Sequence, residues 1–381
     1  MSEHITVLGC GLVGATIARD LAAEGFDVLV VDRDRDLLSQ FQKSAPVRVR
    51  LADLSHAWEI QDLISDAQAV VGSLPGRLGS GMLRSVLEAG KPIADISFSA
   101  EDPLAWNGLA QQRGATAIVD CGVSPGLSNF AVGRAAQTFD EIEDVTILAG
   151  GLPAERSHPY EYAIVFSATD VLEEYTRPAR VVEDGQVVRR PALSELETIE
   201  VPGVGTFEGF LTDGLRTLLS TVPARRMREK TLRYPGHAEQ MRLLRDCGFF
   251  ASEALDVGGV RVAPRAVTER LLRVAWKLEP GEEEFTLVRV TVTGRKAGAH
   301  RRYVFQLLDR TDRVSGTTSM SRTTGFPCSI VAAMLARGEY RSPGVAAPEV
   351  LARDPQAAAR LLDGLKQRGV VWTETEEDIA G

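Results

Sequence analysis

Hydrophobic and polar positions in the first 120 residues follow two alternating periods. Short apolar runs, typical of buried strands, separate stretches in which apolar residues recur every three or four positions, as on one helix face. Strands are predicted at 4–8, 27–31, 47–51, 69–72, 92–95 and 116–119, and helices include 12–24, 81–89 and 105–113. This alternation predicts βαβ units and, with right-handed crossovers, a doubly wound parallel sheet.

The pattern changes after Asp120. Strands are expected at 144–150, 162–167, 179–182 and 186–190, with a hairpin turn at Asp184-Gly185. Long alternating runs at 284–293 and 302–309 predict an antiparallel pair, and helical patterns cover 238–247 and 266–276. This mixture of antiparallel strands and separate helices predicts an α+β domain.

From Thr324 the pattern is helical again, over 330–337 and 355–368, and it ends in a strand-like stretch at 370–372. About 55 residues are too few to form a stable hydrophobic core of their own, so we expect this segment to return to the first domain. The acidic stretch 374–378 is expected to fray.

Composition narrows the class of protein. The chain has 381 residues, 44% of them hydrophobic, and a formal net charge of −9, which suits a globular protein and disfavours nucleic acid or a membrane surface as a partner. No apolar window approaches about 18 residues, so no membrane span is expected. Four cysteines without a CxxC pair and the absence of a leader pattern predict a cytoplasmic protein, and no residue cluster has metal-site spacing.

The sharpest motif is Gly9-Cys10-Gly11-Leu12-Val13-Gly14, which follows a predicted strand and opens a predicted helix. Gly9 permits the tight turn, Gly11 lets a diphosphate approach the backbone, and Gly14 allows close helix–strand packing. Leu12 and Val13 bring free N–H groups of the first helical turn to the phosphates. The alternative is a nucleotide fold with an empty site.

Asp32 ends the second strand, where an acidic side chain accepts hydrogen bonds from the adenosine ribose, so NAD is the expected cofactor. Arg33 and Arg35 follow at once and would suit the 2′-phosphate of NADP, which is the alternative. Other cofactor neighbours are expected beyond the carboxyl ends of the strands. They are Asp53, Ser73, Leu74, Pro75 and Asp95, although Asp95 also suits a helix cap.

Two segments of the second half carry candidate chemistry. One is Gly122–Asn129 (GVSPGLSN), directly after Asp120, and the other is Lys230–His237 (KTLRYPGH). Arg233 is able to clamp a carboxylate, and Tyr234 and His237 are able to move protons. The structural alternatives are a salt-bridged arginine, a packing tyrosine and a helix-capping histidine.

With these motifs the chain resembles the saccharopine dehydrogenase-like superfamily, and within it the bacterial lysine 6-dehydrogenases. The resemblance also rests on GGLP (150–153), VTGRKAG (292–298) and RTTGFP (322–327). Two segments depart from the pattern of that group. They are 211–215, where relatives carry a Ser/Gly-rich stretch, and Pro235, where some carry an arginine.

The resemblance implies an α/β enzyme with a Rossmann domain (1–121) completed by C-terminal residues 322–381, and an inserted α+β domain (122–321) for substrate binding and dimerisation. It implies a homodimer or larger homo-oligomer that uses NAD(P) to oxidise the ε-amine of L-lysine. The product would be 2-aminoadipate 6-semialdehyde, which cyclises to piperideine-6-carboxylate. Saccharopine is the alternative substrate, and an inactive NAD-binding sensor is the alternative from another class.

Site roles follow for the amino-acid substrate. Arg233 is expected to bind its carboxylate, and Tyr234 or His237 to transfer protons. Asp120 is expected to hold an ammonium or order water, with helix capping as the alternative. The predicted substrate-binding residues besides Arg233 are Tyr160, Asp213 and Asn129.

Overall fold

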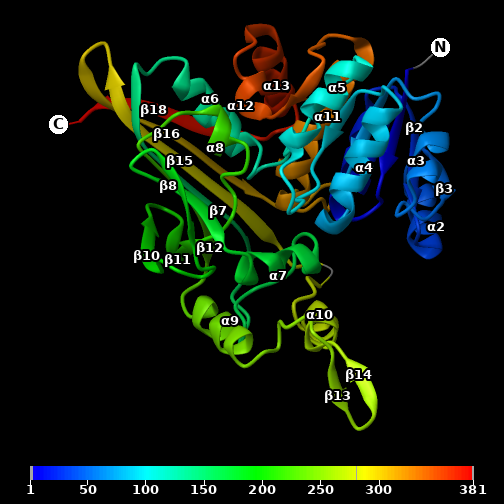
Figure 1. Ribbon diagram of the computed structural model, residues 1–381, viewed down its shortest axis with the longest axis horizontal. Helices are drawn as coiled ribbons and strands as arrows, with labels where there is room; N and C mark the ends of the chain where they lie inside the picture. Colours follow the sequence, from blue (N-terminus) through cyan, green and yellow to red (C-terminus); the bar gives the residue numbers. More distant parts are fainter. Residues whose placement is uncertain (1–2, 280, 380–381) are drawn as a thin grey trace. The chain divides into compact units, whose positions relative to one another are not determined.

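A computed structural model describes residues 3–279 and 281–379 of the chain. The chain divides into two compact units, which we describe one at a time (Figure 1). Unit 1 comprises residues 1–138, 216–222 and 320–371, and unit 2 comprises 139–215, 223–319 and 372–381. In the described part of the chain, no helix is both long and apolar enough to cross a membrane.

Unit 1 is built on a parallel sheet of seven strands in the order β17-β6-β5-β4-β1-β2-β3. The strands are β1 (His4–Leu8), β2 (Asp27–Asp32), β3 (Arg48–Leu51), β4 (Ala69–Gly72), β5 (Ile93–Asp95), β6 (Thr116–Ile118) and β17 (Gly344–Ala346). The predicted doubly wound parallel sheet is therefore confirmed. Its last strand comes from the C-terminal part of the chain and pairs with β6, so C-terminal residues complete this sheet.

Helices and short helical turns lie between or after these strands. They are α1 (Leu12–Ala23), α2 (Arg35–Ser44), α3 (Ala57–Leu63), α4 (Gly76–Glu88), the 3-10 turn η1 (Pro103–Trp106), α5 (Asn107–Arg113), α6 (Leu127–Ala136), α8 (Leu218–Thr221), α11 (Ser319–Arg337), α12 (Pro348–Leu351) and α13 (Pro355–Gln367). Several of these helices, such as α1, α2 and α4, bury apolar residues in the core of unit 1. Strand residues such as Val70 and Ile93 are fully buried in the core on one side of the sheet.

Unit 2 is built on a mixed sheet in which the long strands β7 (Glu141–Pro153), β15 (Glu284–Lys296) and β16 (Ala299–Arg310) are antiparallel neighbours. The other strands of this sheet are β8 (Ala179–Glu183), β9 (Gln186–Arg190), β10 (Glu197–Val201), β11 (Gly205–Leu211), β12 (Arg226–Arg233) and β18 (Trp372–Asp378). The pairing of β7 with β12 is parallel. Helices α7 (Ala168–Thr176), α9 (His237–Asp246) and α10 (Pro264–Ala275), and the separate hairpin β13 (Leu255–Val257)–β14 (Val260–Val262), complete the unit.

The predicted hairpin at Asp184-Gly185 and the predicted β15–β16 pair are confirmed. The strand predicted at 162–167 is wrong: one isolated bridge forms at Ile164, and the Ser167 side chain caps α7 instead. The stretch 374–378 does not fray, because it lies in β18 and pairs with β16.

The boundaries between the two units differ from the predicted domain boundaries, which lie at 121/122 and 321/322. Helix α6 lies in unit 1, and the chain returns to that unit over 216–222, while 372–378 belongs to the sheet of unit 2. These three segments are short, and their assignment depends on long-range pairing that local patterns do not contain.

Candidate active site

The glycine-rich turn after β1 packs too closely for any side chain at two of its positions. A Cβ on Gly9 would lie 2.5 Å from the carbonyl oxygen of Ser73, and a Cβ on Gly14 would lie 2.2 Å from the carbonyl oxygen of Gly9. The Ser73 hydroxyl donates to the carbonyls of Leu8 and Gly9, at 3.0 Å each. Ser73 therefore ties the end of β4 to this turn.

Gly11 is different, because a Cβ there would meet nothing within 4 Å. It is the N-cap of α1, no side chain caps this helix end, and Leu12 is 56% exposed while Val13 is half-buried. The backbone N–H groups of the first turn therefore border open space. This arrangement fits the diphosphate of a dinucleotide, which binds at helix N-termini through backbone N–H groups.

Asp32 ends β2 beside the glycine turn. One carboxylate oxygen accepts from the backbone N–H of Cys10 at 2.7 Å, and the other accepts from that of Asp34 at 3.0 Å. Burial, reinforced by Asp32, raises the pKa of the Cys10 thiol to about 12, so Cys10 stays neutral. Arg33 is exposed, in the position expected for a residue that would meet a 2′-phosphate.

The remaining predicted cofactor neighbours differ in their surroundings. Asp53 is exposed and accepts from the N–H of Ser55, a bond that lowers the pKa of Asp53. Leu74 is buried and Pro75 precedes α4. Asp95 is buried against Gly72, where a Cβ would lie 2.4 Å from its Oδ1, and burial raises the pKa of Asp95 to about 7. Its carboxyl group accepts from the N–H of Ser97 at 2.9 Å.

Asp120 is not a free carboxylate. Arg216 donates to it from Nε and Nη2 at 3.1 Å, and Nη1 of the same guanidinium donates to the carbonyl of Ser99. Both side chains are almost completely buried. Asn129 accepts from the N–H of Gly126 and lies 3.5 Å from the Thr217 hydroxyl, and Thr221 donates to Glu349 at 2.8 Å. Segment 216–222 is therefore held in unit 1 by buried polar contacts that include both predicted residues.

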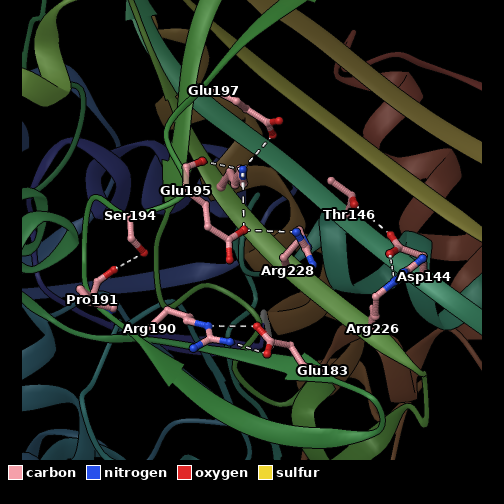
Figure 2. A network of polar contacts seen from close by, with 11 residues as sticks. Asp144, Thr146, Glu183, Arg190, Pro191, Ser194, Glu195, Glu197, Arg226 and Arg228 are labelled. Atoms are coloured by element: carbon pink, nitrogen blue, oxygen red, sulfur yellow. Dashed lines mark hydrogen bonds and ion pairs between the residues drawn. The ribbon is translucent and has the colours of Figure 1, made fainter.

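In unit 2, the two sides of β12 carry different chemistry. Arg226, Arg228 and Lys230 alternate along the strand and lie on one side of it. Figure 2 shows Arg226 and Arg228 there among carboxylates. The pairs there include Arg226–Asp144, Arg228–Glu195, Lys230–Glu197 and, on β8 and β9, Glu183–Arg190. Several of these groups are solvated, and ion pairs of this kind contribute little specific binding energy. The other side of β12 is therefore the better candidate for a specific site.

That other side carries Glu229, Thr231 and Arg233, all buried. Thr212 donates to the carboxyl group of Glu229 and lies 2.8 Å from the Thr231 hydroxyl. Burial raises the pKa of Glu229 to about 8, so this carboxyl group is largely neutral at pH 7.

Arg233 is the centre of what we call the Arg233 cluster: Arg233, Glu174, Tyr162, Tyr175 and His237. Its Nη2 donates to Glu174 at 2.6 Å, and the guanidinium lies 4.5 Å from the ring centroid of Tyr162. In the described part of the chain, Arg233 Nε and Tyr162 Oη have no hydrogen-bond partner although both are buried. The predicted salt-bridged alternative for Arg233 is thus present; Nη1 donates to the carbonyl of Leu232 at 2.9 Å, and Nε is left without an acceptor.

His237 is buried at the start of α9 with both ring nitrogens engaged. Nδ1 lies 2.8 Å from the carbonyl of Tyr160, which only accepts, so Nδ1 carries the proton and Nε2 accepts from Tyr175 Oη at 2.9 Å. Burial and the nearby Arg233 lower the pKa of His237 to about 3. His237 is therefore neutral at pH 7.

Tyr234 is half-buried, and its hydroxyl donates to the carbonyl of Pro153 at 2.9 Å. Burial raises its pKa, so it is a neutral phenol. Tyr160 packs edge-on against Trp276. Asp213 binds Arg180 through both oxygens, at 2.8 and 2.9 Å, so its charge is already compensated.

Sequence reasoning missed the partners that define these groups: Arg216, Glu174, Thr212 and Glu229. Arg216 lies 96 residues from Asp120 and Glu174 lies 59 residues from Arg233. No local motif signals either pair. In the described ranges, no group of three His, Cys, Asp or Glu residues is arranged to hold a metal ion.

Comparisons with known proteins agree with this architecture. The family model for the saccharopine dehydrogenase NADP binding domain matches residues 5–118, and that for the saccharopine dehydrogenase C-terminal domain matches residues 122–370. Alpha-aminoadipic semialdehyde synthase of Arabidopsis thaliana is 23% identical over 259 residues, which are 62% of this chain and 24% of that protein. The chain thus spans about a quarter of the length of this curated relative.

Among solved structures, the apo saccharopine dehydrogenase (L-Glu forming) of Saccharomyces cerevisiae aligns with a TM-score of 0.80 at 17% identity, covering 99% of this chain and 100% of that one. At this identity the likeness concerns the fold. A parallel dinucleotide-binding sheet joined to a mixed-sheet unit defines a class of two-unit dehydrogenases. Within that class, the chain belongs to the saccharopine dehydrogenase family.

Proposed function

We propose that this protein is a nicotinamide-dependent dehydrogenase that oxidises a carbon–nitrogen bond of an amino acid, with the ε-amine of L-lysine as its leading substrate. Family membership, with matches to 5–118 and 122–370, is the observation that carries the proposal. The open position over Gly11 at the start of α1 supports it, because the loop retains the space that a bound diphosphate needs.

The proposed cofactor is NAD. Gly9, Gly11 and Gly14 would form the diphosphate cradle, and Asp32 would accept from the ribose hydroxyls. When bound, the nicotinamide supplies the hydride acceptor for the oxidation. The carboxylate of Asp32 disfavours a 2′-phosphate, while exposed Arg33 would favour one. We therefore expect wild-type protein to prefer NAD, and Asp32→Ser to shift the ratio of kcat/KM values toward NADP.

A substrate ammonium has a reference pKa of about 10.4 and must lose a proton before its carbon can release a hydride. Of the two predicted proton-transfer groups, His237 is buried with both nitrogens engaged, whereas Tyr234 is half-buried and makes one bond to Pro153. This difference favours Tyr234. The pairing of Asp120 with Arg216 favours a positioning role for Asp120.

The proposed carboxylate-binding residue is Arg233. Glu174 occupies one edge of the guanidinium, and the unpartnered Nε leaves a donor for a substrate oxygen. Arg233→Lys should raise KM for the amino acid more than tenfold with a smaller change in kcat. Glu174→Gln is the matched control, because it removes the ion pair and keeps the guanidinium. Equal rises in KM in both variants would indicate a structural role only.

Saccharopine is the second candidate substrate, because the structural relative is named as a saccharopine dehydrogenase (L-Glu forming). The deciding experiment measures NADH formation at 340 nm with L-lysine, L-saccharopine and a panel of other amines. Ammonia release with L-lysine supports the leading proposal, and glutamate release with L-saccharopine supports the second. NADH binding without turnover of any amine would contradict both and indicate a sensor.

A further inference from the structure

Within the described residues, the core of unit 2 buries three hydrogen-bond donors for which the chain supplies no acceptor. They are the hydroxyl of Tyr162, the indole N–H of Trp276 and the Nε–H of Arg233. The three residues are 4%, 1% and 2% exposed. Leaving a buried polar group unpaired costs free energy, so each such group needs an explanation, and a ligand that accepts the hydrogen bond supplies one.

The three donors belong to side chains that contact one another. The guanidinium of Arg233 lies 4.5 Å from the ring centroid of Tyr162. The rings of Tyr162 and Trp276 meet edge to face, with centroids 5.1 Å apart. Apolar residues that include Phe250 and Leu272 pack in the same cluster. Little water screens a polar group in such surroundings, so a hydrogen bond formed there is strong.

The backbone on both sides of Tyr162 is fixed. The carbonyl of Tyr160 accepts from His237 at 2.8 Å, and the N–H of Ile164 donates to the carbonyl of Trp276 at 2.6 Å. Segment 160–164 is thus tied to the start of α9 and to the end of α10. Tyr162 is therefore held in place before a ligand binds, which lowers the entropy cost of binding.

The chemistry of the three atoms defines the group that would bind them. Burial raises the pKa of Tyr162, so its hydroxyl keeps its proton, and the N–H groups of Trp276 and Arg233 only donate. A carboxylate only accepts, and hydrogen bonds to an ionised acceptor are about twice as strong as those between neutral groups. An ammonium group would bring further donors, and the guanidinium of Arg233 would repel it.

We infer that Tyr162 and Trp276 act together with Arg233 as donors to the carboxylate of the substrate, and that they make this carboxylate a requirement of the enzyme. The inference rests on the proposed function and deepens it, because it adds two specificity-determining residues to the proposed carboxylate site. An amine without a carboxylate, such as 1,5-diaminopentane, leaves the three buried donors unpaired and should be a poor substrate.

The first test uses L-norleucine, which has the carboxylate and α-amine of L-lysine and no ε-amine to oxidise. Isothermal titration calorimetry measures its binding to the full-length protein. Tyr162→Phe removes a single oxygen atom and should bind L-norleucine at least about tenfold more weakly than wild type. Tyr340→Phe is the matched control, because it makes the same change in unit 1, and it should bind L-norleucine as wild type does. Equal binding by wild type and Tyr162→Phe, or no binding by wild type, would overturn the inference.

Thermal unfolding without ligand separates this role from a structural one. The Tyr162 hydroxyl has no partner among the described residues, so Tyr162→Phe should melt at or above the wild-type temperature. Tyr175→Phe removes a hydroxyl that binds His237 at 2.9 Å and should melt at a lower temperature. A lower melting temperature for Tyr162→Phe would show that its hydroxyl is bound within the protein, and would contradict the inference.

Trp276 is tested without changing the core. The chain has four tryptophans, and the indole N–H resonance of Trp276 is the one that persists in Trp58→Phe, Trp106→Phe and Trp372→Phe. It should shift on addition of L-norleucine, because a carboxylate oxygen bonded to this N–H changes its shielding. An unchanged resonance at saturating L-norleucine would remove Trp276 from the site.

A pair of substrates distinguishes this inference from the proposed function. Wild type should oxidise L-lysine with a kcat/KM at least about a hundredfold above that for 1,5-diaminopentane, and Tyr162→Phe should lower the value for L-lysine only. If wild type binds L-norleucine through Tyr162 but oxidises no amine, the proposed function fails and the carboxylate-binding role stands. If wild type oxidises L-lysine and Tyr162→Phe retains the same kcat/KM, this inference fails and the proposed function stands.

Discussion

Arg216 and Asp120 form a buried, two-point ion pair between two residues that both have left-handed backbone conformations, with φ of 52° and 51°. Such conformations cost free energy in residues other than glycine and persist where surrounding contacts hold them. Here the ion pair itself holds segment 216–222 to the carboxyl end of β6, next to the loop that contains Ser99.

Removing Arg216 should therefore destabilise the protein strongly. Arg216→Ala leaves a buried carboxylate without its partner, and we expect a loss of about 3–5 kcal/mol in the free energy of unfolding. The double variant with Asp120→Ala should lose less than the sum of the two single variants, because it removes both charges. Urea unfolding of the four proteins measures this coupling, and additive losses would mean that the pair contributes no interaction energy.

Substitutions at two glycines of the nucleotide loop should distinguish an effect on folding from an effect on cofactor binding. Gly14→Ala places a Cβ against the backbone of Gly9, so we expect a loss of about 1–3 kcal/mol in stability. Gly11→Ala meets no atom of the chain and should stay within about 1 kcal/mol of wild type, but its methyl group enters the predicted diphosphate cradle.

Thermal unfolding and NADH fluorescence titration together check this contrast. Gly11→Ala should keep the wild-type melting temperature and bind NADH at least tenfold more weakly. If it binds NADH as tightly as wild type does, the diphosphate does not approach the backbone at Gly11.

The sequence was sufficient for the elements and residues that depend on local pattern. The strand–helix alternation of the first 118 residues, the glycine turn and the acid at Asp32 all have fixed local signatures, and the structure contains each of them. The Asp-Gly turn between β8 and β9 is of the same kind, because its signal lies in two residues.

What could not be predicted depends on distant pairing. Arg233 and Asp120 were singled out for their chemistry, but their partners Glu174 and Arg216 come from other elements. The stretch 374–378 is acidic and exposed, so its pattern indicates no strand, and it becomes one because β16 offers an edge lined with arginines such as Arg301 and Arg302. Whether Arg233 and Tyr234 act on substrate stays a prediction.

His237 should make the protein sensitive to mild acid. The unfolded chain protonates this histidine near pH 6.5, whereas the native state keeps it neutral down to about pH 3. Below pH 6.5 the unfolded state thus binds more protons, and native stability should fall by up to about 1.4 kcal/mol per pH unit from this group. Urea unfolding of wild type and His237→Gln between pH 7 and pH 5 measures the difference.

In His237→Gln this part of the pH dependence should vanish, leaving a shallower slope. His300→Gln is the matched control, because His300 is a histidine that is partly exposed beside Glu143. Identical slopes in wild type and His237→Gln would show that His237 titrates in the native protein as it does in the unfolded chain.

The contribution of Asp95 to native stability should depend on pH in the opposite direction to that of His237. Its native pKa is raised to about 7 from 3.8, so between these values the native state retains a proton that the unfolded chain has released. The stability that Asp95 contributes to the native state by retaining this proton is therefore complete below about pH 4, and it is lost as the pH rises toward 7. Asp95→Asn mimics the protonated acid and keeps an oxygen for the N–H of Ser97. Relative to wild type, Asp95→Asn should gain on the order of 2 kcal/mol between pH 5 and pH 8.

Asp102→Asn is the matched control, since Asp102 is an exposed carboxylate that also accepts one backbone N–H, from Leu104. The result for Asp95 bears on the site as well, because the charges of the Asp120–Arg216 pair act on the pKa of Asp95. A difference between Asp95→Asn and wild type that is the same at pH 5 and pH 8 would mean that Asp95 is ionised throughout this range.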